Sequence, residues 1–211
     1  MFYQRKMDQA LRFGDVLRGY ISATPNIKEP LIKEPIWPAL NEGYTIGINL
    51  PIFTVVLSPC CSIGEKTIAL TPLIKLRSDF FKNPYFAEDF TRINRKMEPE
   101  KSVPPDKWAE FSQAQKRTRI EEEQTYVLVN LFVYEKHDLF PKYTIRTQEI
   151  NYYMIDFGNT YKLNCQEIIT PQRSPLDSKC LQLSTGARSE LRDKIASYYT
   201  RVPVEDKILE D

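Results

Sequence analysis

The chain has 211 residues and carries 29 Lys and Arg against 28 Asp and Glu. A chain of this length can bury a core without disulfide or metal staples, so we expect residues 1–211 to form one domain. The net charge of +1 excludes a bulk electrostatic field for nucleic acid or a membrane surface, which leaves only a local patch for such partners. Four cysteines are too few for a disulfide scaffold, so we expect reduced thiols.

The sequence also argues against a membrane location. No apolar run approaches the roughly 20 residues of a membrane-spanning helix. The opening residues, Met1–Lys6, are not followed by an apolar signal region. We therefore predict a cytoplasmic protein that makes no contact with a membrane.

The first half of the chain predicts strands separated by a proline-rich loop. Residues 11–20 indicate a first strand, and four prolines within 23–41 indicate a long extended loop. Residues 53–58 are short, β-branched and apolar on both faces, which is typical of a central strand. Residues 67–76 follow as its partner, so the two segments predict a hairpin.

The second half begins with a segment of different composition and periodicity. Charge rises over 79–123 and helical spacing appears, which predicts an insertion that is helical at both ends. Strands are expected again at 125–134 and 143–147. Residues 151–156 and 161–169 then predict a second hairpin, closed by a glycine-containing turn.

Residues 184–200 predict a C-terminal helix, which Ser184 or Thr185 can cap. Its apolar stripe recurs at spacings of three or four and consists of Leu183, Ala187, Leu191, Ile195 and Tyr198. The stripe can pack on the body or serve as a docking surface, and we favour packing. Arg188, Arg192 and Lys194 lie largely off this stripe, so we expect them to stay solvated.

Three short segments, in order, carry a resemblance to a known family. They are Gly14-Asp15-Val16, residues 51–58 and residues 68–73. These segments resemble the PemK/MazF toxins, whose barrels begin with Gly-Asp-Val and continue through a Pro-x-Val-Val-Leu-Ser strand into an apolar strand with proline. The resemblance covers residues 12–76, and it implies a small β-barrel of the SH3 type that cleaves single-stranded RNA.

The resemblance also implies where the chemistry would lie. The toxins rely on an arginine just before the Pro-x-Val-Val-Leu strand and on a hydroxyl in the loop after it. Here Leu50 takes the place of the arginine, and Ser62 can occupy the hydroxyl position. A ribonuclease would therefore need another cation to stabilise the transition state. The candidates are Arg18, if its strand directs it into the groove, and Lys66.

A second resemblance, to bacterial proteins of unknown role, is closer in size. These proteins share a strand that ends in a Ser-x-x-Cys-Asp type of motif, long insertions and a Leu-Ser-x-x-x-Arg-x-x-Leu helix. Residues 58–61 are similar to the first motif without its aspartate, and residues 183–191 are similar to the helix.

Together these patterns predict the fold class. We expect an α+β protein: an SH3-type small β-barrel with a core at about 11–76 and 125–170, the helical insertion 79–123 and the C-terminal helix 184–200.

Cys60 and Cys61 form the most unusual local feature. They are candidates for a reactive thiol, a metal-ligand pair or the lip of a binding site, although the favoured interpretation is that one thiol is buried and the other faces a neighbouring loop. Adjacent cysteines do not readily chelate one zinc ion, and His137 is the only histidine, so we predict no metal site and no cofactor. His137 stands in a charged segment and is interpreted as a solvated loop residue rather than as a base for either cysteine.

Two functions follow from the sequence. The leading hypothesis is a non-catalytic binding or scaffolding module of a bacterial multi-protein system, of the phage-defence or toxin–antitoxin-like kind, with another protein as its partner. Cys60 and Cys61 are its candidate binding residues. The alternative is a PemK/MazF-like endoribonuclease that would act on RNA through Arg18, Ser62 and Lys66.

Overall fold

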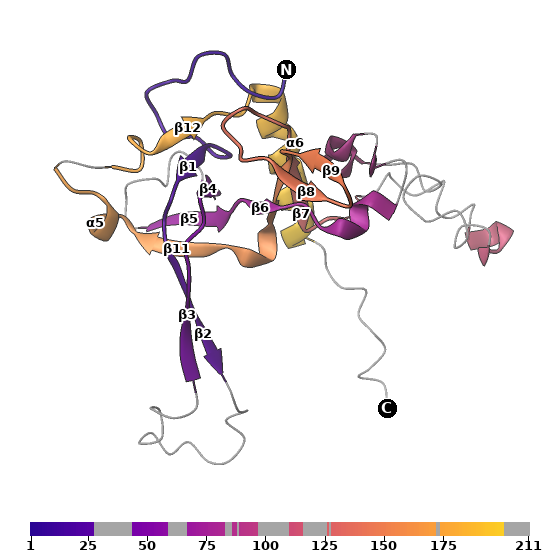
Figure 1. The fold of residues 1–211 in the computed structure, drawn as a ribbon, viewed down its shortest axis with the longest axis horizontal. Coiled ribbons are helices and arrows are strands. Elements are labelled where there is room, and N and C mark those ends of the chain that lie inside the picture. Colours follow the sequence, from indigo (N-terminus) through magenta and orange to yellow (C-terminus); the bar gives the residue numbers. More distant parts are fainter. Residues whose placement is uncertain are drawn as a thin grey trace.

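A computed structural model shows the architecture. It describes residues 1–27, 44–58, 67–82, 86–87, 89–96, 110–115, 126, 128–171 and 174–200. These residues form an α+β protein in which antiparallel sheets pack with one long helix (Figure 1). The α+β class is thus confirmed, while within the described ranges the strands form separate sheets and no closed barrel is found.

The larger sheet has five strands in the order β11-β5-β4-β1-β12. Their bounds are β1 Val16–Arg18, β4 Phe53–Val56, β5 Thr67–Pro72, β11 Tyr161–Asn164 and β12 Lys179–Leu181. The central strand is β4, because Val55 joins one buried cluster and Val56 joins another. The predicted hairpin of β4 with β5 is confirmed by their antiparallel pairing.

The smaller sheet has the order β6-β10-β7, with β6 at Ile74–Lys75, β7 at Leu131–Tyr134 and β10 at Tyr153–Asp156. Within the described residues, the chain passes from one of these sheets to the other at two points. It does so at Leu73, between β5 and β6, and again through the 3-10 turn η5, Phe157–Asn159, between β10 and β11.

The predicted second hairpin is therefore wrong. Strand β10 pairs with β6 and β7, whereas β11 pairs with β5 in the other sheet. The cause lies in the turn: the Asp156 side chain accepts from the Gly158 amide, and Phe157 is buried in the core. These two anchors redirect the chain to the neighbouring sheet instead of reversing it.

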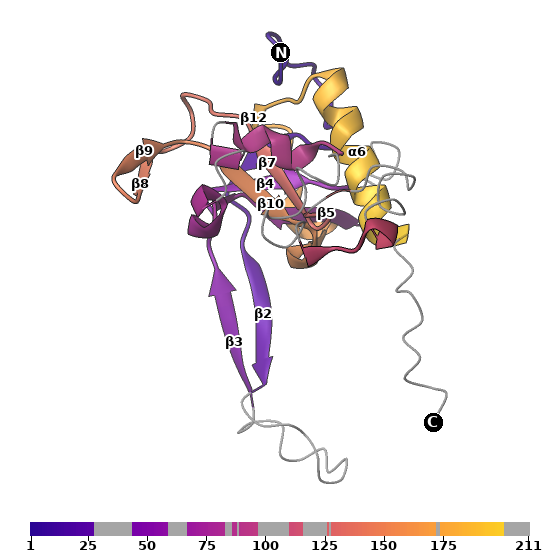
Figure 2. The same ribbon diagram turned by 90° about the vertical axis from the view of Figure 1, so that its right-hand side faces the viewer.

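Two further hairpins stand apart from the sheets. One pairs β2 (Ser22–Ile27) with β3 (Tyr44–Asn49), and the other pairs β8 (Tyr143–Ile145) with β9 (Gln148–Ile150). Both views show β2 and β3 projecting away from the body (Figures 1 and 2).

The hairpin of β2 and β3 corrects part of the predicted proline-rich loop. Residues 23–27 form a strand even though they contain Pro25, which is paired opposite Ile46. Proline is tolerated in a strand with an unpaired edge, where no neighbour needs its amide hydrogen. The rest of the predicted loop, 28–41, lies outside the described residues.

The described parts of the insertion include two 3-10 helices, η3 at Ser78–Lys82 and η4 at Phe90–Asn94, and α-helical residues at 86–87 and 113–115. The Asp89 side chain caps η4 by accepting from the amide of Thr91. Their apolar residues cover the smaller sheet in a cluster of Leu76, Phe80, Phe86, Phe90, Ile93, Leu131, Val133 and Met154. Residues 97–109 and 116–123 of the predicted insertion lie outside the described residues.

Several predicted strands are longer than the observed ones. The first strand keeps only Val16–Arg18 of 11–20, because Gly14 turns the chain with a φ of +85°. Residues 128–130 form a turn ahead of β7. Residues 165–168, predicted as strand, instead form the short helix α5, Cys165–Ile168, because the Asn164 side chain caps it by accepting from Gln166.

The predicted C-terminal helix is confirmed as α6, Thr185–Thr200. The Ser184 hydroxyl accepts from the Ala187 amide at 3.2 Å, as expected for an N-cap residue. Ala187 and Leu191 enter the main core. Lys194 contradicts the expectation of a solvated side chain, because it is completely buried against η4, where its ammonium donates to the Ile93 carbonyl.

Candidate functional site

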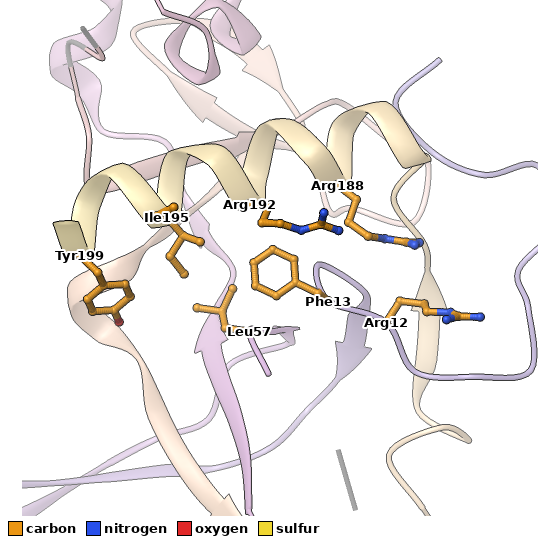
Figure 3. A pocket seen from close by; sticks show the side chains of 8 residues that line it. Arg12, Phe13, Leu57, Arg188, Arg192, Ile195 and Tyr199 are labelled. Carbon is orange, nitrogen blue, oxygen red and sulfur yellow. The ribbon is translucent and has the colours of Figure 1, made fainter. Parts of the chain in front are cut away.

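A groove of about 620 Å³ runs along α6, beside the turn that precedes β1 and the end of β4 (Figure 3). Its described lining consists of Arg12, Phe13, Leu57, Arg188, Arg192, Ile195, Ala196 and Tyr199. Figure 3 shows the three arginines toward one end and Leu57, Ile195 and Tyr199 toward the other, with Phe13 between them. We call these the arginine end and the apolar end of the groove.

One stripe of α6 supplies half of this lining. Arg188, Arg192, Ile195 and Tyr199 recur at spacings of four, three and four, so they share one face of the helix. This face lies next to the buried face of Ala187 and Leu191. This face was not predicted from the sequence, because both arginines were expected to be solvated. Their helical spacing with Ile195 was the available signal.

The arginine end is held in place by hydrogen bonds. The Nε of Arg12 donates to the Asp8 carboxylate at 3.0 Å. The Nη2 of Arg188 donates to the backbone carbonyl of Leu183 at 3.1 Å. Arg192 is exposed, and in the described part of the chain no ion pair of its guanidinium is found. Two of the three cations are thus fixed before any ligand arrives.

A buried ion pair fixes the turn that carries Arg12 and Phe13. Asp15 is inaccessible to solvent, and its carboxylate lies 2.8 Å from the Lys179 ammonium and 2.8 Å from the Arg12 amide. Burial raises the pKa of Asp15, although its hydrogen bonds with Lys179 and Arg12 act in the opposite direction. The pair therefore joins the turn to β12 on the far side of β1.

Gly14 explains why this turn can approach α6 so closely. Its φ is +85°, and a Cβ atom at this position would lie 3.1 Å from the Cδ2 of Leu191 in α6 and 2.6 Å from the Cδ1 of Leu183, just before the helix. Only glycine combines that backbone conformation with the available space. Gly14, Asp15 and the buried Val16 thus each have a structural role, because together they position one wall of the groove.

The apolar end lies where β4 ends. Leu57 follows β4 directly and is only 8% exposed, Ile195 is half-buried, and Tyr199 is 66% exposed. The next residue, Ser58, is buried, and its hydroxyl accepts from the Ala69 amide at 2.8 Å. The groove therefore lies next to Ser58, the last described residue before 59–66 in the sequence.

The residues predicted from the sequence are placed differently. Arg18 pairs opposite Phe53, at the start of β4, and its guanidinium lies 6.0 Å from the centre of the Phe53 ring. At about 3.3 Å per residue, Phe53 and Ser58 are roughly 16 Å apart, so Arg18 lies at the opposite end of β4 from the groove. The other predicted site residues, Cys60, Cys61, Ser62 and Lys66, lie outside the described residues.

His137 and the two described cysteines, Cys165 and Cys180, take part in packing or hydrogen bonds of the fold. The His137 ring is half-buried rather than solvated; it packs edge-to-face on Tyr3 at 5.1 Å, and its Nδ1 accepts from the Leu139 amide. Cys165 is buried, and the thiol of Cys180 donates to the Val16 carbonyl at 3.3 Å. Within the described ranges, no three His, Cys, Asp or Glu side chains gather in a way that could hold a metal ion.

Comparisons with known proteins identify no relative of this chain. No protein family matches the chain, and no curated protein or solved structure is found to be similar to it. Among the described helices, none has the length and apolar character needed to cross a membrane.

Proposed function

We propose that this chain is a non-catalytic binding module of a bacterial, cytoplasmic multi-protein system of the defence or toxin–antitoxin-like kind, with the groove along α6 as its binding surface. The observation that carries the proposal is the composition of the groove. Three guanidiniums lie at one end and apolar side chains at the other. The described lining contains no histidine, cysteine or carboxylate that could serve as nucleophile or base.

The proposal includes an SH3-type barrel related to the PemK/MazF toxins. It is supported by the way the three resembling segments come together. Gly14-Asp15-Val16 leads into β1, and β1, β4 and β5 are neighbours in one antiparallel sheet. The 3-10 turn between β10 and β11 and the bend between β5 and β6 link the two sheets, as closure of a small barrel requires.

A specific observation keeps the endoribonuclease as the second candidate. The apolar end of the groove adjoins the end of β4, after which residues 59–66 with Ser62 follow in the sequence, and Arg192 and Arg188 lie farther along the same groove. Arg188 or Arg192 would then supply the cation that Leu50 and the remote Arg18 do not. Arginine suits this role because its guanidinium binds phosphate oxygens in pairs.

An RNA-cleavage assay separates the two candidates. The purified protein is incubated with a fluorescein-labelled single-stranded RNA of mixed sequence, and the products are separated on a denaturing gel. We expect no cleavage above that of a mock purification. Cleavage that disappears in the Ser62→Ala variant, and in Arg18→Ala or Arg192→Ala, would replace the binding module with the ribonuclease and would identify its cation.

A further inference from the structure

We propose that the groove along α6 binds an acidic segment of a partner protein, with two or more carboxylates at the arginine end and apolar side chains at the apolar end. This inference rests on the proposed function and adds the chemistry of the partner. It is built from charge complementarity and from the separation of the lining into two parts.

The charge of the arginine end calls for an anionic ligand. Asp8 already pairs with Arg12, and the buried Asp15 carboxylate interacts electrostatically with Arg188. No direct ion pair of Arg188 or Arg192 with a carboxylate is found in the described part of the chain, and Arg192 faces solvent. The two residues are one helical turn apart, so their guanidiniums face the groove side by side (Figure 3). A planar guanidinium binds a carboxylate through two parallel hydrogen bonds, which matches an aspartate or glutamate of a partner.

Arg188 carries a second indication of a missing acceptor. Its Nε is buried and has no hydrogen-bond partner, while Nη2 is anchored on the Leu183 carbonyl. Proteins rarely leave a buried donor unsatisfied. A carboxylate that docks on the edge of the guanidinium, after a small rotation of the side chain, would supply the acceptor.

The remainder of the site favours a protein segment over a nucleic acid. Glu190 and Asp193, near Arg192 in α6, are exposed carboxylates, so the helix surface outside the groove does not continue the row of cations. A nucleic acid backbone needs a track of cations, and the chain has a net charge of only +1. Leu57, Ile195 and Tyr199 instead offer contact area for aliphatic or aromatic side chains.

The size of the groove limits what it can hold. Cavities of about 300–1,000 Å³ enclose drug-sized ligands. A groove of about 620 Å³ therefore accommodates the side chains of a short segment rather than a folded domain. We expect two carboxylates and one or two apolar anchors to occupy it.

The test uses a library of random dodecapeptides displayed on phage, selected on the full-length protein and counter-selected on an Arg192→Glu variant. The expected consensus holds at least two acidic residues next to an apolar pair. The most enriched peptide is then synthesised with a fluorescein label, and its dissociation constant is measured by fluorescence anisotropy. Arg192→Glu should weaken binding at least tenfold, and binding should weaken as salt rises from 50 to 300 mM.

The matched control is Arg146→Glu. Arg146 is exposed at the turn between β8 and β9, on the side of the body opposite α6 (Figure 2). The same charge reversal there should change the dissociation constant less than twofold. Because Arg192 is exposed, its variant should melt within about 2 °C of the parent, as surface substitutions usually do.

Three peptide results would overturn the inference: no enriched peptide, a consensus without acidic residues, or equal binding to the Arg192→Glu variant. Tighter binding of a fluorescein-labelled single-stranded RNA dodecamer, lost in Arg192→Glu, would also overturn it. These results leave the proposed function standing as long as RNA is not cleaved. Cleavage in the separate assay is the outcome that removes the proposed function itself.

Discussion

Lys194 is the residue whose environment differs most from what its type suggests. Its side chain is completely buried, its ammonium donates to the Ile93 carbonyl, and it lies 5.3 Å from the centre of the Tyr126 ring. Burial lowers the pKa of Lys194 from its usual 10.5 to about 7. The folded protein therefore releases this proton at a lower pH than the unfolded chain does.

The lowered pKa of Lys194 determines how the free energy of unfolding changes with pH. Between about pH 7 and pH 10.5 the unfolded chain binds a proton that the folded protein does not, so stability rises with pH in that window. We expect the unfolding free energy of the parent protein to rise, relative to that of Lys194→Met, by roughly 1.4 kcal/mol per pH unit between pH 7.5 and 9.5. Urea unfolding at both pH values measures it. Parallel curves for the two proteins would contradict the assignment, and the exposed Lys162→Met serves as control.

At this scale the sequence predicted that Gly14-Asp15-Val16 matters, but through resemblance alone. The physical roles of these residues are visible only in the folded structure: a positive φ at Gly14, an ion pair from Asp15 to Lys179 and the buried contacts of Val16. Lys179 lies 164 positions beyond Asp15 in the chain, so nothing local announces the pairing. Lys194 was missed for a related reason, since its burial depends on η4 of the insertion.

Among the elements, α6 both supports the core and forms the groove. Leu191 is completely buried in the main cluster, whereas Arg192, the next residue, is exposed toward the groove. We expect Leu191→Ala to lower the free energy of unfolding by about 2–5 kcal/mol, because truncating a buried leucine leaves a cavity. Arg192→Ala should change it by less than about 0.5 kcal/mol. Thermal and urea unfolding of both variants measure this contrast, and a Leu191→Ala protein that melts like the parent would show that α6 is not anchored.

Element types were easier to predict than their partners. The β-branched run 53–58 and the stripe of 184–200 each carry a strong local signal, and both became the expected element. The hairpin expected between 151–156 and 161–169 failed, because a capped 3-10 turn and a tertiary contact of Phe157 decide the direction of the chain. Residues 165–168 were predicted as the continuation of a strand, but they follow the capping Asn164 and form a short helix.

Only part of the groove could be predicted from the sequence. Its wall on α6 could be read from helical spacing, because Arg188, Arg192 and Ile195 share a face. Its opposite wall comes from Arg12 and Phe13, which precede β1, and from Leu57, which follows β4, and all three are far from α6 in the sequence. Only the tertiary fold brings these parts together.

Across the whole molecule, one core joins both sheets and the helix. The main cluster takes Val55 from the five-stranded sheet, Phe132 and Ile155 from the three-stranded sheet, and Leu191 from α6. We therefore expect a single cooperative unfolding transition, as is usual for one domain. Far-ultraviolet circular dichroism and the near-ultraviolet signal of the buried tyrosines should give the same urea midpoint. Two separated midpoints would instead divide the chain into independent units.

The pairing of the chain's two distant parts has a consequence for its biosynthesis. Strand β1 pairs with β12, Tyr3 forms a bridge with Leu183, and the hydrogen-bonded Val16 and Cys180 are 164 positions apart. A ribosome adds about 5–20 residues per second, so roughly 10–30 s pass between the two strands. During that interval β1 has no partner on one edge, and unpaired edges invite association with other chains. The five-stranded sheet therefore closes only after residues 179–183 have been made and released.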